Sequence, residues 1–303
     1  MTLPAPETRA APAGNAYLDR LAARSVATGT VLCLGLDPDP AALPPGFPPD
    51  RRGVEAFASL VLDAAVPFAA AVKPNLAFYE AFGSAGLAAL ERLRQRIPSD
   101  VPVVIDAKRA DIGSTAARQA VALFDVLGAD AVTVSPYLGE EAITPLLERA
   151  DRFAYVLCRT SNPGAGELQS LVVERDADDD APAEPLWARV ARRTQAWGPG
   201  GTVGLVVGAT APDELEGARR IAPGLAFLVP GLGAQGGDVG AVLRHGPGVA
   251  APAAGRPGGG LLVNVSRAIA VPPAGEARGG RGDPGERIAT AARDWAERLP
   301  VLT

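Results

Sequence analysis

The feature that most constrains the fold is a regular alternation of short apolar runs with longer amphipathic segments. Each run is bounded by turn-forming residues, and the segments between the runs carry apolar residues at helical spacing. Because the runs are continuously apolar, both faces of each strand are expected to be buried, as in a parallel sheet covered by helices. The predicted strands cover residues 30–37, 68–75, 101–108, 131–137, 153–160, 203–210, 226–233 and 260–267.

Eight strands separated by helices predict a single-domain α/β protein, a closed (β/α)8 TIM barrel over residues 15–303. An open doubly wound sheet is the structural alternative. The Pro/Ala-rich residues 1–14 are expected to form a flexible tail, and three polar or Gly/Pro-rich excursions at 164–184, 246–260 and 271–285 are expected to be surface loops. The predicted helices cover residues 54–66, 84–97, 114–128, 140–150, 185–197, 212–222 and 286–299.

Composition excludes several classes of protein. A net charge of −5 and a pI near 5.1 predict no general affinity for nucleic acid or for an anionic membrane. The N-terminus has no apolar signal segment, and no apolar run reaches membrane-spanning length, so we expect a cytoplasmic protein. Cys33 and Cys158 lie in apolar runs and are predicted to be buried thiols. The one histidine, His245, is expected to be a surface residue in a loop.

Lysine is rare in this chain: only Lys73 and Lys108 are lysines among 29 basic residues. Arginine can supply positive charge at most positions, but only lysine can release a proton at workable pH. The two lysines are therefore candidates for chemistry, with chance in a small sample as the alternative. Three of the four asparagines, Asn75, Asn162 and Asn264, also follow apolar runs.

Charged residues gather where the first three predicted strands end. Asp37 ends the first strand, Lys73 the second, and Asp106 and Lys108 the third, with Asp111 in the following turn. Catalytic groups of TIM barrels lie at these carboxyl ends, and residues two apart on a strand point to the same side. Charges of alternating sign would keep one another ionised there. A simple ion-pair network at the barrel rim is the alternative.

The segment DAKRADIGST at 106–115 resembles the DxKxxDIxxT signature of orotidine 5'-phosphate decarboxylases. LGLDPDP, VKPN, RTSNPG, VPGLGAQGGD and NVSR follow in the order typical of that family, and the resemblance covers roughly residues 15–300. The long loops are more similar to the bacterial subfamily with extended loops, type 2. The resemblance implies a carboxy-lyase that converts orotidine 5'-phosphate to UMP and CO2 in de novo pyrimidine biosynthesis, without cofactor or metal.

The resemblance also implies roles for four charged residues. Lys73 would hold Asp106 and contact the ribose, Asp106 would face the substrate carboxylate, and Lys108 would deliver a proton to C6 of the pyrimidine. Asp111 would enter the active site of a partner subunit, which implies a homodimer. The resemblance implies that Asp37 binds the ribose, that Ser161 contacts the pyrimidine, and that Gln235 and Arg267 bind the phosphate with Ser266 sharing the contact. The other substrate-binding residues that it implies are Ile112 and Thr115, which accompany Asp111, and Asn162 and Pro230.

This chemistry is physically coherent with the residues. Loss of CO2 leaves a carbanion in the plane of the ring, with no adjacent group to absorb the electrons, so a nearby cation is needed. Lys108 could stabilise that charge and then protonate it. A general acid typically raises the rate of a reaction by about 10² to 10⁴-fold. Binding of the remote phosphate must therefore supply further stabilisation of the transition state.

Other functions fit parts of the pattern. GLGAQG at 231–236 matches the GxGxxG dinucleotide fingerprint, but it follows the seventh strand, where TIM barrels commonly bind a phosphate. A Mg-dependent sugar-phosphate lyase or aldolase of the same barrel superfamily also uses a DxKxxD pattern. A barrel that binds UMP as a sensor, without turnover, is the alternative that is not an enzyme.

Overall fold

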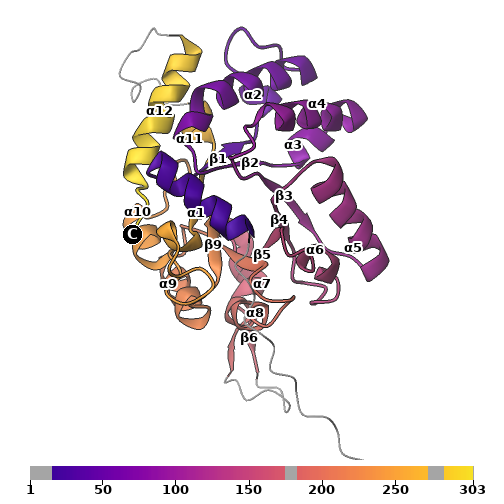
Figure 1. The fold of residues 1–303 in the computed structure, drawn as a ribbon, viewed down its shortest axis with the longest axis vertical. Coiled ribbons are helices and arrows are strands. Elements are labelled where there is room, and N and C mark those ends of the chain that lie inside the picture. Colours follow the sequence, from indigo (N-terminus) through magenta and orange to yellow (C-terminus); the bar gives the residue numbers. More distant parts are fainter. Residues whose placement is uncertain (1–15, 175–182, 272–282, 303) are drawn as a thin grey trace, which may run out of the picture.

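The computed structural model describes residues 16–174, 183–271 and 283–302, and the predicted tail of residues 1–14 lies outside them. Eight parallel strands form the centre of the molecule, surrounded by helices (Figure 1). All eight correspond to predicted strands. They are β1 (Leu32–Leu36), β2 (Ala71–Pro74), β3 (Val104–Arg109), β4 (Ala131–Val134), β5 (Phe153–Arg159), β8 (Val203–Val207), β9 (Ala226–Val229) and β10 (Leu262–Val265).

The sheet closes on itself. The hydrogen-bonded order is β2-β1-β10-β9-β8-β5-β4-β3, and the two end strands meet through parallel bridges between Val72 and Val103 and between Asn75 and Asp106. This closure confirms the predicted (β/α)8 barrel and excludes the open doubly wound sheet. Strands β1, β2, β4, β8 and β9 are buried along their whole length, as expected where side chains of both faces pack, inside the barrel and under the helices.

The helices cover the outside of the barrel and connect its strands. In Figure 1, α12 runs beside α2, with which it is in contact. The α-helices are α1 (Ala16–Thr28), α2 (Arg51–Ala65), α3 (Ala77–Glu80), α4 (Gly83–Arg96), α5 (Gly113–Ala120), α6 (Thr144–Leu147), α7 (Gly166–Gln169), α8 (Leu186–Thr194), α9 (Pro212–Ile221), α10 (Val239–His245), α11 (Arg267–Ala270) and α12 (Pro284–Arg298).

Two predicted helices differ from the structure. In segment 140–150 the helix is only the single turn α6, and it starts late because Pro145 lacks an N–H and is tolerated only at the start of a helix. Segment 114–128 is α5 followed by the π-helical turn Val121–Val126. His245, predicted in a loop, is the half-buried last residue of α10.

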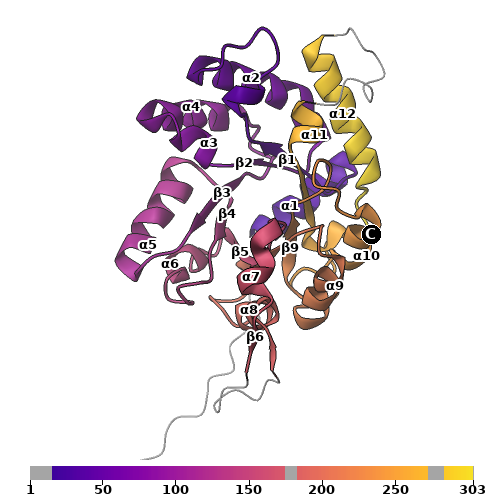
Figure 2. The ribbon, with the colours of Figure 1, turned by 180° about the vertical axis from the view of Figure 1, so that it is seen from behind.

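Helix α1 was not predicted, and it closes one end of the barrel. Its residues Tyr17, Leu18 and Leu21 are buried in the cluster that fills the barrel interior. The Tyr17 ring stacks on Phe153 with ring centroids 4.9 Å apart, and its hydroxyl hydrogen-bonds that of Tyr155 at 3.0 Å. Figure 1 looks onto this end, and Figure 2 shows the opposite end, with α7 and α11 toward the viewer. Helix α1 therefore covers the end of the barrel opposite to α7 and α11.

The predicted loops are more structured than expected. Excursion 164–184 contains α7 and an antiparallel pair of short strands, β6 (Val172–Val173) and β7 (Glu184–Pro185). Excursion 246–260 ends in a short 3-10 segment, Pro257–Gly260, whose glycines are buried. Most of excursion 271–285 falls outside the described residues.

The two cysteines, Cys33 and Cys158, are buried free thiols, as predicted. Among the residues that the structure describes, no helix combines the length and the apolar character needed to cross a membrane.

Candidate active site

A cavity of about 490 Å³ lies at the carboxyl ends of the barrel strands. Catalytic groups of TIM barrels are found at this end, because the loops that follow the strands converge there. Ten of the predicted site residues line the cavity: Asp37, Lys73, Asp106, Lys108, Ser161, Asn162, Pro230, Gln235, Ser266 and Arg267.

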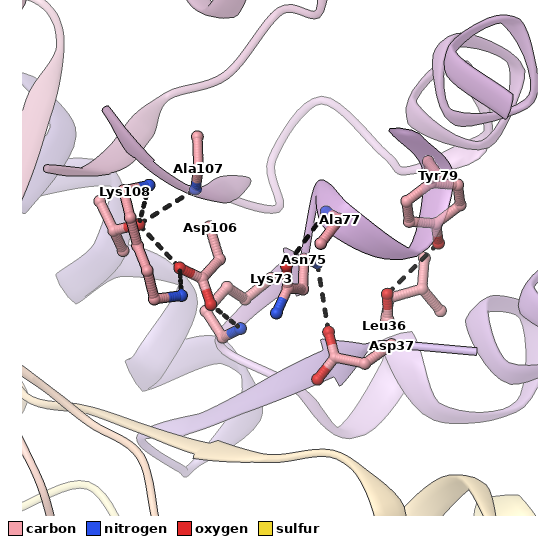
Figure 3. A network of polar contacts seen from close by, with 10 residues as sticks. Leu36, Asp37, Lys73, Asn75, Ala77, Tyr79, Asp106, Ala107 and Lys108 are labelled. Carbon is pink, nitrogen blue, oxygen red and sulfur yellow. Dashed lines mark hydrogen bonds and ion pairs between the residues drawn. The ribbon is translucent and has the colours of Figure 1, made fainter. Parts of the chain in front are cut away.

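The two lysines meet on one carboxylate, as Figure 3 shows. The Nζ atom of Lys73 lies 3.2 Å from Oδ2 of Asp106, and the Nζ atom of Lys108 lies 2.6 Å from Oδ1 of the same residue. The side chain of Lys73 is 5% exposed, whereas that of Lys108 is 48% exposed. Lys73 is thus a buried support for Asp106, and Lys108 is the more exposed cation that faces the cavity.

Burial and charge together set the ionisation of this cluster. Burial alone would lower the pKa of Lys73, but the charges of Asp37 and Asp106 raise that pKa above its ordinary value. Burial would raise the pKa of Asp106, but Lys73 and Lys108 hold that pKa well below its usual range. Both groups are therefore ionised at neutral pH.

Asp37 joins the cluster from β1. Its Oδ1 atom accepts a hydrogen bond from the backbone N–H of Asn75 at 3.2 Å, which ties the end of β1 to the end of β2 (Figure 3). The cavity is thus lined by carboxylates and ammonium groups in alternation, as the sequence predicted.

Lys108 reaches Asp106 by a route that strand alternation did not predict. Its backbone has φ of 49°, in the left-handed region that residues other than glycine rarely adopt. The pairing of β3 with β4 shifts register between Ile105 and Arg109, so Lys108 sits in a bulge. The two-residue spacing predicted the correct side for the Lys108 side chain. Its position, however, is set by the bulge and not by regular strand alternation.

The opposite part of the cavity is built for close approach of a ligand to the backbone. Gly231, in the loop after β9, has φ of 107°, which favours glycine. Gln235 in the same loop, together with Ser266 and Arg267 after β10, also lines the cavity. This end combines a glycine-rich loop with one guanidinium group, an arrangement that suits a phosphate.

Between the two polar ends, the barrel interior is apolar. Leu157, Val206 and Leu228 line the cavity from β5, β8 and β9. Gly35 of β1 leaves no room for a side chain, because a Cβ there would lie 2.5 Å from the Cβ of Ser266. The site is therefore an apolar slot with a charged cluster on one side and Gln235, Ser266 and Arg267 on another.

Three predicted residues do not line this cavity. The structure describes Asp111, Ile112 and Thr115, but none of the three is among the residues that line the cavity. The Oδ1 atom of Asp111 accepts a hydrogen bond from the N–H of Ile112 at 2.7 Å, and Ile112 is 69% exposed.

Sequence reasoning left five polar lining residues out of the site. They are Asp39, Asn75, Thr133, Thr160 and Asn264. Asn75 and Asn264 had been noticed as asparagines that follow apolar runs, and Thr160 lies in the quoted RTSNPG segment. Thr133 interrupts the apolar run AVTV at an inward-facing position, and that interruption was the available signal.

Among the described residues, no cluster of three or more histidine, cysteine, aspartate or glutamate side chains is placed to hold a metal ion.

Comparisons with known proteins agree with this geometry. The model of the Orotidine 5'-phosphate decarboxylase / HUMPS family matches residues 30–278. An orotidine 5'-phosphate decarboxylase of Roseiflexus castenholzii is 47% identical over 88% of this chain and 90% of its own, and that of Thermomicrobium roseum is 44% identical over 93% of each chain. The structure of Leishmania donovani OMP decarboxylase superposes with a TM-score of 0.72 at 36% identity, over 93% of this chain and 96% of that one.

Proposed function

The chain belongs to the orotidine 5'-phosphate decarboxylase / HUMPS family, and we propose that it converts orotidine 5'-phosphate to UMP and CO2 in de novo pyrimidine biosynthesis. The observation that carries the proposal is the pair of lysine ammonium groups on the single Asp106 carboxylate at the open end of the barrel. The long similarity to named orotidine 5'-phosphate decarboxylases supports this activity over that of a Mg-dependent sugar-phosphate lyase or aldolase.

The cavity suits a nucleotide monophosphate. In the proposed complex, the phosphate binds Gln235 and Arg267, with Ser266 sharing the contact. The ribose lies near Asp37 and Lys73, and the pyrimidine ring lies against the apolar slot with Ser161 and Asn162 at its edge. The carboxylate on C6 then faces Asp106 and Lys108.

The proposed reaction begins when the bond from C6 to the carboxylate breaks. The carboxylate leaves as CO2, and the bonding electron pair stays on C6 as a carbanion. The Lys108 ammonium group stabilises this charge and then transfers a proton from Nζ to C6, which gives UMP and a neutral amine that water reprotonates. Stabilisation of developing charge by a preorganised cation and general acid catalysis thus act through one side chain.

Asp106 has two roles in this scheme. Its negative charge beside the substrate carboxylate disfavours the bound ground state and is relieved as CO2 leaves. Asp106 also forms a salt bridge with Lys108, and this holds the Lys108 Nζ atom 2.6 Å from Oδ1 of Asp106 before the substrate binds. Lys73 keeps Asp106 ionised from the buried side.

One general acid cannot supply the whole acceleration. Enzymes lower barriers by about 8–23 kcal/mol, and a single general acid contributes about 10² to 10⁴-fold. The remainder is proposed to come from phosphate binding, whose energy closes the surrounding loops and orients the ring over Lys108.

We also propose a homodimer in which Asp111 of one subunit completes the site of the other. Asp111, Ile112 and Thr115 lie outside the subunit's own cavity. Ile112 is 69% exposed, and Tyr137 and Leu138 in the loop after β4 are 83% and 56% exposed. Such exposed apolar side chains are typical of a subunit interface.

Two further parts of the proposal concern location and cofactors. The enzyme is proposed to be cytoplasmic, which is supported by its two buried free thiols. It is proposed to work without cofactor or metal, because the Lys108 ammonium group can supply both the charge that stabilises the carbanion and the proton that quenches it.

The direct test is an assay of purified protein with orotidine 5'-phosphate in the presence of EDTA, following substrate absorbance and identifying the product by chromatography. Catalytic amounts of protein are expected to convert all substrate to UMP. Turnover that stops with EDTA and returns with Mg²⁺ would favour the metal-dependent lyase or aldolase. Binding of UMP without turnover would favour the sensor.

A further inference from the structure

Thr133 occupies a central place in the charged cluster. It lies on β4, is 1% exposed, and lines the cavity beside Asp106 and Lys108. Its hydroxyl donates a hydrogen bond to Oδ1 of Asp106 at 2.7 Å. The same oxygen accepts hydrogen bonds from the backbone N–H groups of Ala107 and Lys108, each at 3.0 Å.

These contacts use the full capacity of the hydroxyl. A threonine hydroxyl has one proton to donate and two lone pairs to accept with. The proton goes to Asp106, and the two lone pairs receive the N–H groups of Ala107 and Lys108. One side chain therefore satisfies three groups in the buried wall of the site.

The strand geometry explains why a side chain is needed there. Ile105 pairs with Val132 and Arg109 pairs with Val134, so four residues along β3 span the same distance as two along β4. The N–H groups inside this bulge lose the regular ladder of backbone hydrogen bonds. Thr133 replaces that ladder at the point where Lys108 has its left-handed φ of 49°.

Such a backbone conformation is unfavourable for lysine and persists only where its surroundings hold it. The Thr133 hydroxyl contacts both the backbone of Lys108 and the carboxylate that its ammonium group contacts. It thereby fixes both ends of the side chain that is the proposed proton donor.

We propose that Thr133 is a positioning residue for decarboxylation, whose hydroxyl holds the bulge of β3 and the Asp106 carboxylate so that the Lys108 ammonium group faces the reacting carbon. This inference rests on the proposed function. Thr133 acts through Asp106 and Lys108, and its loss is expected to slow the chemical step more than it weakens nucleotide binding.

The test compares Thr133→Val with Thr133→Ser and the wild type. Valine keeps the shape but removes the hydroxyl, and serine restores it. We expect Thr133→Val to lower kcat by roughly 10- to 100-fold, the usual effect of losing a hydrogen bond to a charged group. The KM for orotidine 5'-phosphate and the Kd of UMP should stay within about threefold, and Thr133→Ser should recover most of the lost kcat.

Thr202→Val is the matched control, because Thr202, which directly precedes β8, is also a buried threonine and its hydroxyl donates to the carbonyl of Leu147, away from the cavity. It should leave kcat within about twofold. If Thr133→Val does not fold, Thr133→Ala removes the same hydroxyl without placing a methyl group against the Asp106 carboxylate and the two N–H groups.

Three results would overturn the inference: an unchanged kcat in Thr133→Val, a serine variant as slow as the valine variant, or an equal loss of kcat in the Thr202 control. A wild-type protein that does not decarboxylate orotidine 5'-phosphate would instead refute the proposed function, so the two failures are distinguishable.

Discussion

Replacing Lys73 with methionine should lower the free energy of unfolding at neutral pH by about 3 kcal/mol. The side chain of Lys73 is 5% exposed, and its ammonium group lies 3.2 Å from Asp106. Removing one partner of a buried ion pair leaves the other charge uncompensated and typically costs about 3–5 kcal/mol. The lower end applies because Asp106 keeps its contacts with Lys108 and Thr133.

The loss should depend on pH in a defined direction. Because the pKa of Asp106 is depressed in the folded protein, its contribution is fully present above its unfolded pKa, near about 3.9, and is lost as pH falls toward the folded value. Because the pKa of Lys73 is raised, its contribution is fully present below about pH 10 and is lost as pH rises through the folded pKa. The difference between wild type and Lys73→Met should therefore be constant from about pH 5 to pH 9 and shrink below about pH 4.

Thermal unfolding of the wild type and of Lys73→Met, followed by circular dichroism at pH 7 and pH 3.5, measures the loss of stability and its dependence on pH. At about 2–3 °C per kcal/mol for a chain of this size, the Tm at pH 7 should fall by roughly 6–9 °C. Lys108→Met is the control, because Lys108 contacts the same carboxylate but is 48% exposed. An exposed pair contributes about 0–1 kcal/mol, so its Tm should change by less than about 3 °C. Equal losses in both variants, or none in Lys73→Met, would refute the reasoning from burial.

Three other substitutions probe separate parts of the account. Arg267→Ala should raise the KM for orotidine 5'-phosphate by roughly 10- to 150-fold through loss of a charge-assisted hydrogen bond, and steady-state kinetics that show an unchanged KM would remove Arg267 from the phosphate site. Gly35→Ala should destabilise the fold by about 1–3 kcal/mol, because the added Cβ would lie 2.5 Å from the Cβ of Ser266; chemical denaturation with an unchanged midpoint would contradict that close contact. Ile112→Asp should convert the proposed dimer to monomer in sedimentation velocity and lower kcat, since Asp111 would no longer reach the partner's site, whereas a fully active monomer would exclude a shared site.

The barrel could be predicted from the sequence because each strand is a continuous apolar run. Parallel strands under helices bury both faces, so their signal does not depend on register. Helix α1 was missed although its buried residues Tyr17, Leu18 and Leu21 recur at helical spacing. Its place across the end of the barrel, where Tyr17 stacks on Phe153, is a contact far apart in sequence that no local pattern encodes. The short α6 shows the opposite case, where Pro145 in the sequence could have predicted the late start of the helix.

The charged cluster was predictable in its members but not in its geometry. Asp37, Lys73, Asp106 and Lys108 each end an apolar run, and the carboxyl ends of barrel strands converge. The bulge of β3 depends on its register against β4, which no local pattern encodes. Thr133 gave a local signal, because it interrupts an apolar run, but its contacts with Asp106 and Lys108 depend on the same register.

The substrate-binding residues were assigned through resemblance, and their contacts remain predictions. Ser161, Gln235 and Arg267 line the cavity, which agrees with the assignment without testing it. Asp111 and Ile112 lie outside the cavity of their own subunit, so their assignment depends on the proposed dimer.

The most direct measurement is the rate of orotidine 5'-phosphate decarboxylation by Lys108→Ala, with folding checked by circular dichroism and binding checked with UMP. If the ammonium group beside Asp106 stabilises and protonates the carbanion, kcat should fall by at least about 10²-fold while UMP still binds. A folded variant that binds UMP and decarboxylates at the wild-type rate would contradict the proposed mechanism.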